Sequence, residues 1–257
     1  MLITVAGGRL GAQQAAQRQD VAIIVDALRA SVTCASLLHY GAREIIVVED
    51  MDQAFQERLK RPDAWLAGER GGLKVEGFDL GNSPLQAPLP GLPETIVFSS
   101  SNMSRCCAGA SSCPVALLGT LPTLTAAATL ALNAARSLGR DITLIPAGSV
   151  LDECKLVLED YVAAGALLEK MRKLSGNSAT ASGDAARAAQ DVWTAAQARG
   201  VERAFLETDN GVSLIGMGFE DDVRFAATMD AFKVVPRVTG TYILDNGDPA
   251  AILTAAE

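Results

Sequence analysis

An aspartate and an arginine stand where the apolar run VAIIVDAL, at residues 21–28, comes to an end. The run stops at Asp26, and Arg29 follows three residues later. A carboxylate beside a guanidinium suits a divalent metal ion bound next to a phosphate or a sulfonate. The alternative is an Asp–Arg pair that only closes a turn, with Ser31 capping the helix that follows.

The segment at residues 67–84, AGERGGLKVEGFDLGNSP, combines glycines with charges of both signs. Glycine lets backbone N–H groups approach a ligand closely, while carboxylates bind metals and cations hold anions. Its candidate side chains are Glu69, Arg70, Lys74, Glu76, Asp79 and Asn82. A solvent-exposed loop can carry the same charges without any function. Because this segment directly follows a predicted strand, we favour a binding role.

A run of hydrogen-bonding side chains closes the apolar stretch at residues 95–101 and leads into a predicted helix. The candidates are Ser101, Asn102, Ser104 and Arg105. Hydroxyl groups at the N-terminus of a helix form a natural anion site. The alternative is a helix cap, for which one serine would suffice.

Acids surround the start of a helix predicted at residues 155–173. Asp152 and Glu153 lie in the preceding turn, where acids commonly stabilise the helix dipole. Glu159 and Asp160 lie within the apolar stretch LVLEDYVAAG, so we expect at least one of them to face inwards. A buried carboxylate needs a cation or a proton. Both are therefore candidate metal ligands.

The composition limits the classes of partner. The chain of 257 residues has 22 basic and 30 acidic side chains, a net charge of −8. An acidic surface repels phosphate backbones and anionic membranes, so we expect neither nucleic acid nor a membrane as a partner. An anionic substrate must be held by a local positive pocket or by a metal ion. The single histidine, His39, excludes mechanisms that need two, and its apolar helical surroundings predict packing or capping.

The sequence shows no sign of export. The N-terminus has no basic run followed by an apolar core, and no stretch approaches about 18 consecutive apolar residues, which predicts a cytoplasmic protein. The five cysteines include no CxxC pair, so we expect reduced thiols. The glycine motif AGGRLG at residues 6–11 leaves a nucleotide-cofactor enzyme open, but alone it is a weak signal.

The elements that must position these residues alternate between strands and helices. Apolar runs lie at residues 2–7, 21–28, 44–49, 64–69, 95–101, 115–120, 141–148 and 204–208. They are continuously apolar, as in strands covered on both faces of a parallel sheet, whose ligands bind at the carboxyl ends. Helices are predicted at residues 31–40, 52–60, 122–138, 155–173 and 184–199. The pattern predicts an α/β fold divided near residue 125 into domains 1–125 and 126–257.

The motifs together resemble those of the 2-phosphosulfolactate phosphatase family, the ComB-like phosphatases of coenzyme M biosynthesis. They are VDALRAS, AGERGGLKVEGFDLGNSP, the SSSN strand end, LEDYVAAG and GMGFEDDVRFAATMDAFKVVPR. The resemblance implies a magnesium-dependent phosphatase that converts 2-phosphosulfolactate into 3-sulfolactate and phosphate. It also implies a three-layer α/β/α architecture with mostly parallel sheets and two similar intertwined domains.

The resemblance assigns candidate residues motif by motif. The matching residues are Asp26, Arg29, Glu69, Arg70, Asp79, Asn82, Asn102, Arg105, Glu159 and Asp160. The sequence differs from the family pattern in three places. Met103 stands at a glycine, Asn210 at a histidine, and Val150 in a turn that is normally Gly-Thr-x-Gly.

The resulting hypothesis is a Mg²⁺ ion held by Asp26, Glu69 and Asp79, with Arg29 and Arg70 gripping the substrate's anionic groups. Candidate substrate-binding residues are Lys74, Asn82, Ser101, Asn102, Ser104 and Arg105, and Glu159 and Asp160 are further candidate metal ligands. The nucleophile is either a water molecule or Asp26. The expected partners are a small anionic phosphomonoester and, as an open alternative, a second copy of the chain. The alternative function is a non-catalytic or divergent small-anion-binding protein on the same scaffold.

Overall fold

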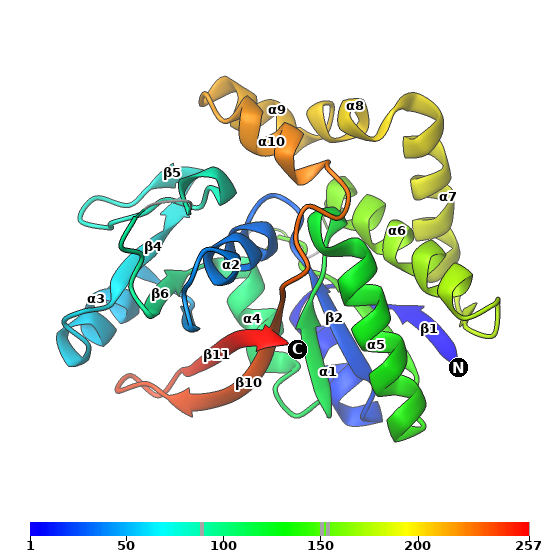
Figure 1. Cartoon of the computed structure of the whole chain (residues 1–257), viewed down its shortest axis with the longest axis horizontal. Helices are drawn as coiled ribbons and strands as arrows, with labels where there is room; N and C mark the ends of the chain where they lie inside the picture. Colours follow the sequence, from blue (N-terminus) through cyan, green and yellow to red (C-terminus); the bar gives the residue numbers. More distant parts are fainter. Residues whose placement is uncertain (88–89, 150–151, 153–154, 257) are drawn as a thin grey trace.

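A computed structural model describes residues 1–87, 90–149, 152 and 155–256 of the protein. Its centre is a sheet whose strands lie in the order β5-β4-β6-β3-β11-β10-β7-β2-β8-β1-β9 (Figure 1). The strands are β1 (Leu2–Val5), β2 (Val21–Val25), β3 (Glu44–Val48), β4 (Trp65–Arg70), β5 (Leu73–Lys74), β6 (Thr95–Ser99), β7 (Val115–Leu118), β8 (Ile142–Pro146), β9 (Thr180–Ala181), β10 (Val235–Ile243) and β11 (Pro249–Ala256).

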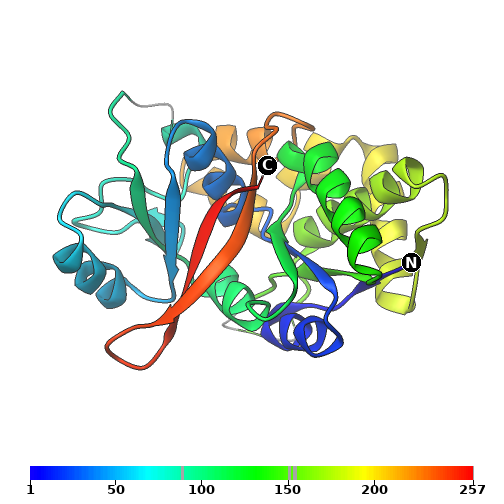
Figure 2. The same cartoon turned by 60° about the horizontal axis from the view of Figure 1, so that its bottom comes forward.

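The sheet consists of two groups of parallel strands joined by an antiparallel hairpin. One group contains β4, β6 and β3, and the other contains β7, β2, β8, β1 and β9. In the hairpin, β11 pairs antiparallel with β3 and β10 pairs antiparallel with β7. Figure 2 shows the hairpin lying between the two groups. The last two strands of the chain therefore unite the groups into one sheet.

Helices cover both faces of the sheet. They are α1 (Gly8–Arg18), α2 (Ala30–His39), α3 (Met51–Lys60), α4 (Ser101–Gly109), α5 (Leu124–Leu138), α6 (Leu158–Leu174), α7 (Asp184–Arg199), α8 (Val201–Leu206), α9 (Asp209–Gly216) and α10 (Glu220–Ala226), with 3-10 turns at Pro84–Gln86 and Leu121–Thr123. None of the described helices combines the length and the apolar character needed to cross a membrane.

The buried strand β2 explains the layered arrangement. Val21, Ile23 and Val25 pack with α5, α6 and α7 in one core, whereas Ala22 and Ile24 pack with α1, α2 and α4 in another. Because successive side chains of a strand point to opposite faces, a continuously apolar strand must be covered on both sides. The expected three-layer α/β/α fold is confirmed.

Most predicted elements are present within a few residues of their expected bounds. Residues 204–208 were predicted as a strand but lie mainly in α8, where Phe205 is fully buried in the core shared with α7. The C-terminal hairpin was absent from the predicted elements. The division into two similar domains near residue 125 stays a prediction.

Candidate active site

Asp26 stands just beyond the carboxyl end of β2, and its side chain is bonded to the first residue of helix α2. Its side chain is buried, and its Oδ1 accepts a hydrogen bond of 3.1 Å from the backbone N–H of Ala30. The expectation that Ser31 caps this helix is wrong, because the Ser31 hydroxyl oxygen accepts a 3.2 Å bond from the N–H of Asp26 itself. The backbone therefore fixes the carboxylate at the strand end.

Asp160, in the first turn of α6, bridges the ends of two neighbouring strands. Its Oδ1 accepts a 2.8 Å bond from the N–H of Ala27, which follows Asp26. Its Oδ2 accepts a 3.2 Å bond from the N–H of Gly148, just beyond β8. Both Asp160 and Glu159 are buried, so the expected inward-facing acid is present.

Burial raises the pKa values of the three acids near the end of β2, which are Asp26, Glu159 and Asp160. Burial raises the pKa of Asp26 to about 7, and the charges of Glu69 and Glu159 add to the effect. Burial, with the charges of Asp26 and Glu159, holds the pKa of Asp160 well above its usual range. Burial also raises the pKa of Glu159, whose Oε1 accepts a 2.6 Å bond from the Asn210 amide. Acids in this arrangement favour a proton or a cation near neutral pH.

Arg29 forms an ion pair with an acid from the far end of the chain. Its Nη1 donates to Asp222 Oδ2 at 2.7 Å, and its Nη2 donates to the Gly72 carbonyl at 2.7 Å. The guanidinium carbon also lies 4.3 Å from the centre of the Phe219 ring. Only 2% of the Arg29 side chain and 5% of the Asp222 side chain are exposed. Arg29 is thus a buried residue that connects Asp222 to the loop at Gly72, and the alternative of a turn-closing pair with Asp26 is wrong.

The glycine-rich loop after β4 reaches the region of Asp26 through the bond between Arg29 and the Gly72 carbonyl. Glu69 Oε2 accepts a 2.7 Å bond from the N–H of Gly72, whose φ of +87° favours glycine. Arg70 donates to the Glu49 carbonyl and to the Ser99 hydroxyl, both at 3.0 Å. Arg70 therefore ties together the ends of β3, β4 and β6.

Asp79 does not join the other acids, which corrects the predicted metal trio. Its Oδ2 accepts a 2.8 Å bond from the N–H of Leu66, and its carboxylate pairs with Arg58. Leu66 lies near the start of β4 and Glu69 near its end. The loop after β5 turns back along β4, and this return places Asp79 away from Asp26.

The donor set fits a sparse magnesium site better than a closed one. Within residues 1–87, 90–149, 152 and 155–256, no group of three or more acidic, histidine or cysteine side chains is arranged to hold a metal. Mg²⁺ often binds through one or two carboxylates, with water and substrate phosphate completing its shell. Asp26 with Glu159 or Glu69 suits this role, because a divalent cation would relieve their mutual repulsion.

Asn82 offers a further oxygen donor in this region. Its Oδ1 is buried and has no hydrogen-bond partner in the described part of the chain. The next residue, Ser83, donates a 2.7 Å bond to Asp222, the partner of Arg29. A buried acceptor left unpaired costs free energy, so this amide suits a ligand. Lys74, by contrast, is exposed and lies opposite Glu69 in the β4–β5 pair.

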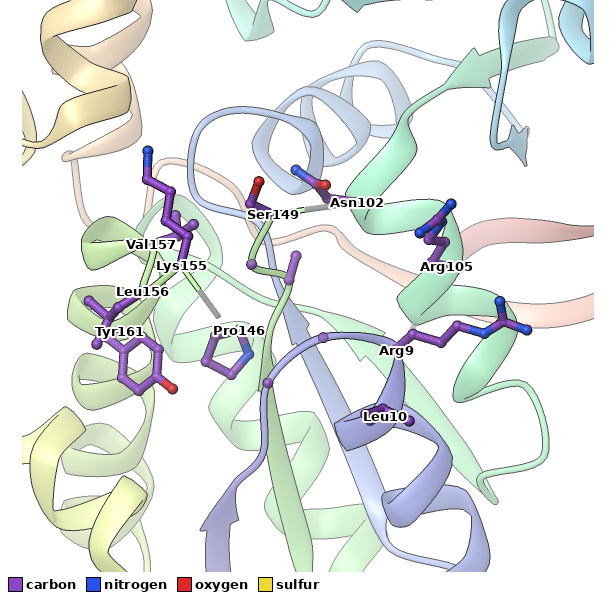
Figure 3. A pocket seen from close by; sticks show the side chains of 14 residues that line it. Arg9, Leu10, Asn102, Arg105, Pro146, Ser149, Lys155, Leu156, Val157 and Tyr161 are labelled. Carbon is purple, nitrogen blue, oxygen red and sulfur yellow. The ribbon is translucent and has the colours of Figure 1, made fainter. Parts of the chain in front are cut away.

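A cavity of about 370 Å³ opens at the same edge, as Figure 3 shows. Its described lining residues are Gly7, Gly8, Arg9, Leu10, Asn102, Arg105, Pro146, Ala147, Gly148, Ser149, Lys155, Leu156, Val157 and Tyr161. Gly148 is also the donor to Asp160, so the cavity adjoins the buried carboxylates. This described lining includes three cations and no acid, as expected for an anion site in an acidic protein.

The serine-rich strand end contributes only partly to this cavity. Asn102 and Arg105 line it. Ser104 is buried within α4 and donates a 3.3 Å bond to the Ser101 carbonyl. Met103, the bulky residue at the glycine of the family pattern, is fully buried in the core beside α4. Its side chain therefore packs inwards.

The glycine motif at residues 6–11, which the sequence indicated only as a weak nucleotide signal, contributes to the lining of the cavity. Gly8 and Arg9 line the cavity. Gly8 has φ +64°, and a Cβ on Gly11 would lie 2.0 Å from the Ala6 carbonyl oxygen. The motif thus forms the tight turn that begins α1. Its glycines were a usable signal for a strand-end site.

The remaining candidates stay outside this chemistry. His39 is the last residue of α2 and is exposed, so the expectation of core packing is wrong, although its ring centre lies 5.0 Å from that of Phe232. The described cysteines are free thiols, and burial raises the pKa of Cys106, which keeps it protonated and unreactive. Val150 and Glu153 lie outside the described residues.

Buried acids beside a cationic cavity, at the carboxyl ends of strands in an α/β sheet, define a class of protein that acts on a small anion. The sequence profile of the family described as 2-phosphosulpholactate phosphatase matches residues 10–241. The chain belongs to this family, which confirms the resemblance found in the motifs and supports a phosphatase.

Similar proteins in three bacteria carry the name "Probable 2-phosphosulfolactate phosphatase". The protein of Carboxydothermus hydrogenoformans is 34% identical over 223 residues, covering 85% of this chain and 86% of that protein. The protein of Parasynechococcus marenigrum is 33% identical over 222 residues, covering 84% and 88%. The protein of Thermotoga petrophila is 32% identical over 228 residues, covering 87% and 91%.

Proposed function

We propose that the protein hydrolyses 2-phosphosulfolactate to 3-sulfolactate and inorganic phosphate with the help of Mg²⁺. The observation that carries the proposal is the Asp160 bridge, which sets the acids at the end of β2 against the cavity wall at Gly148. The names of the family and of its members supply the substrate. The three cations of the cavity supply the local positive charge that such an anion needs in a chain of net charge −8.

The buried acids and the buried arginine have different parts in this reaction. A phosphate monoester repels an incoming nucleophile, so its negative charge must be neutralised. Mg²⁺, when bound by Asp26 with Glu159 or Glu69, supplies that neutralisation. Arg29 is a positioning residue, because it holds the Gly72 backbone to which the Glu69 carboxylate is bonded.

Asp26 is the residue that provides or directs the nucleophile. In one route its carboxylate attacks phosphorus, the alcohol leaves, and water hydrolyses the acyl phosphate. In the other route the carboxylate accepts a proton from the attacking water. Both routes need an ionised carboxylate, which a neighbouring cation favours by lowering the pKa.

A panel of phosphomonoesters, assayed with Mg²⁺ and with EDTA, tests the proposal. We expect phosphate release from 2-phosphosulfolactate, loss of release in EDTA, and a fall of about 10³-fold or more in Asp26→Asn with the fold intact. Asp63→Asn, an exposed Asp on the turn before β4, is the matched control and keeps full activity. A folded Asp26→Asn variant with the wild-type rate would exclude both routes.

The alternative is an anion-binding protein without turnover, favoured by the cationic cavity alone. It predicts that 3-sulfolactate raises the melting temperature while no phosphomonoester in the panel releases phosphate. Phosphate release that depends on Mg²⁺ excludes it.

A further inference from the structure

One of the three cations that line the cavity has no partner among the described residues. Arg105 pairs with Glu49 through two nitrogens, at 2.6 and 2.5 Å, and Lys155 pairs with Asp209 at 3.3 Å. Arg9 lines the same cavity and has neither a hydrogen-bond nor an ionic partner among the described residues. A guanidinium without a partner, on a wall whose described residues include no acid, is available to an anionic ligand.

Helix packing places Arg9 beside Arg105. Helices α1 and α4 approach closely at Gly109, where a Cβ would lie 2.9 Å from Ala12 Cβ and 3.2 Å from the Arg9 carbonyl oxygen. Arg105 precedes Gly109 by one helical turn, and Arg9 precedes Ala12 by nearly one turn, so both side chains emerge at the N-terminal end of the helix pair. Figure 3 shows them on one side of the cavity and Lys155 on the other.

The cavity has room and polar groups for more than the phosphate that reacts. At about 370 Å³ it falls within the size range of sites for whole small molecules. Its Gly148 wall adjoins Asp160 and the other acids, whereas Arg9 stands at the start of α1. The guanidinium of Arg9 is exposed, so no existing contact must break when it turns to a ligand. A substrate with its phosphate beside the acids can therefore direct a second anionic group to Arg9.

We propose that Arg9 is a specificity-determining residue, which binds the oxyanion of the substrate that is not transferred, a carboxylate or a sulfonate. This inference rests on the proposed function and deepens it, because it makes a second oxyanion the feature that the enzyme selects. Arg9 touches no reacting atom. Its loss therefore weakens substrate binding and leaves the chemical step intact.

Steady-state kinetics of Arg9→Gln provide the first test. We expect KM for 2-phosphosulfolactate to rise about 10-fold or more, as for a lost charge-assisted hydrogen bond, with kcat within about twofold of wild type. KM for ethyl phosphate, which has no second oxyanion, stays unchanged. 2-Phospholactate, which lacks the sulfonate, identifies the group that Arg9 binds. If Arg9→Gln also raises KM for 2-phospholactate, Arg9 binds the carboxylate. If KM for 2-phospholactate is the same as in wild type, Arg9 binds the sulfonate.

Arg140→Gln is the matched control, because Arg140 is exposed and lies beyond α5 at the opposite end of β8. It changes the net charge equally and keeps the wild-type KM. An equal KM for 2-phosphosulfolactate in both variants overturns the assignment of Arg9.

Calorimetric titration with 3-sulfolactate tests the same contact without turnover. We expect about 10-fold weaker binding by Arg9→Gln than by Arg140→Gln. Equal affinities, or a wild-type protein that does not bind 3-sulfolactate, overturn the inference. A wild-type protein that binds 3-sulfolactate through Arg9 but hydrolyses no phosphomonoester overturns only the proposed reaction.

Discussion

The buried surroundings of Asp26 favour the neutral, protonated form of its carboxyl group. Burial, with the charges of Glu69 and Glu159, raises its pKa from an ordinary 3.8 to about 7 in the folded protein. At a pH between these two values, the Asp26 carboxyl group therefore keeps its proton in the folded state and has lost it in the unfolded state. As pH rises through this range the free energy of unfolding falls, and the loss is complete above the higher value.

We expect Asp26→Asn to stabilise the metal-free protein, and to do so more at alkaline pH. Its advantage over wild type grows by about 1–3 kcal/mol between roughly pH 5 and pH 8, because asparagine stays neutral and still accepts from the helix backbone. Urea unfolding in EDTA at several pH values measures this difference. Mg²⁺ added to wild type recovers part of the loss at high pH by binding the folded state. An advantage that shrinks with rising pH contradicts the assignment.

The buried Arg29–Asp222 ion pair predicts that substitution of Asp222, which takes no part in the reaction, strongly lowers the stability of the fold. Asp222→Asn leaves the buried Arg29 guanidinium without its counter-charge, so we expect the free energy of unfolding to fall by about 3–5 kcal/mol. The neighbouring Asp221 is exposed, and Asp221→Asn is the matched control with a change below about 0.5 kcal/mol. Equal unfolding midpoints for the two variants would show that the ion pair contributes nothing.

Strand-end motifs predicted which residue types gather at the candidate site but not their partners. Asp26 and Asp160 were recognisable because an acid interrupts an apolar run. Asp222 is 193 residues from Arg29, and no local spacing connects them. Asp79 was misplaced because a loop's return path depends on backbone bonds, here from its own N–H and that of Leu80 to the Leu66 carbonyl, which composition does not encode.

At the scale of elements, helix α3 anchors the C-terminal hairpin through one buried acid. Glu57 Oε2 accepts a 2.6 Å bond from the Tyr242 hydroxyl of β10, and Oε1 accepts a 3.0 Å bond from Lys60. Although burial opposes ionisation, these groups and Arg61 hold the pKa of Glu57 below its ordinary value. A lowered carboxyl pKa contributes stability at neutral pH that is lost as pH falls through the folded-state value.

Glu57→Gln should therefore destabilise the protein at neutral pH by about 1–3 kcal/mol. The difference from wild type narrows as the pH falls through the lowered pKa of Glu57, where this residue itself becomes protonated. Thermal melts across this pH range measure it, with the exposed Glu76→Gln as the control. A difference that is independent of pH would mean that the charge of Glu57 does not anchor the hairpin.

Apolar runs identify elements well where both faces of a strand are buried, and poorly elsewhere. β2 is buried at every residue, and its pattern alone predicted it. The hairpin strand β10 is half exposed along most of its length and was missed. Residues 204–208 show the converse, since a short apolar run such as AFLET fits a strand and a buried helix turn equally. Only the packing of Phe205 against the helical layer decides between them.

At the scale of the whole molecule, the hairpin determines whether the two strand groups behave as one unit. The candidate acids and Arg29 come from both sides of this junction, since Asp26 follows β2 and Glu69 belongs to β4. A site assembled across a junction keeps its geometry only if the junction is rigid. The continuous pairing through β10 and β11 supplies that rigidity.

One tryptophan in each group makes this coupling measurable. Trp65 lies in β4, and Trp193 lies in α7, which packs on the other group. We expect Trp65→Phe and Trp193→Phe, each reporting through the remaining tryptophan, to show the same urea midpoint, because unfolding one group removes a pairing edge from the other.

Adding Leu253→Ala tests whether the hairpin is the connection. Leu253 is fully buried in β11, so its truncation should cost about 2–5 kcal/mol and lower both tryptophan midpoints together. The two groups unfold independently if Leu253→Ala lowers the urea midpoint reported by Trp65, in the Trp193→Phe background, but leaves unchanged the midpoint reported by Trp193, in the Trp65→Phe background. The acids and Arg29 would then be held together by their own contacts, above all the Arg29–Gly72 and Arg29–Asp222 bonds, and not by the sheet.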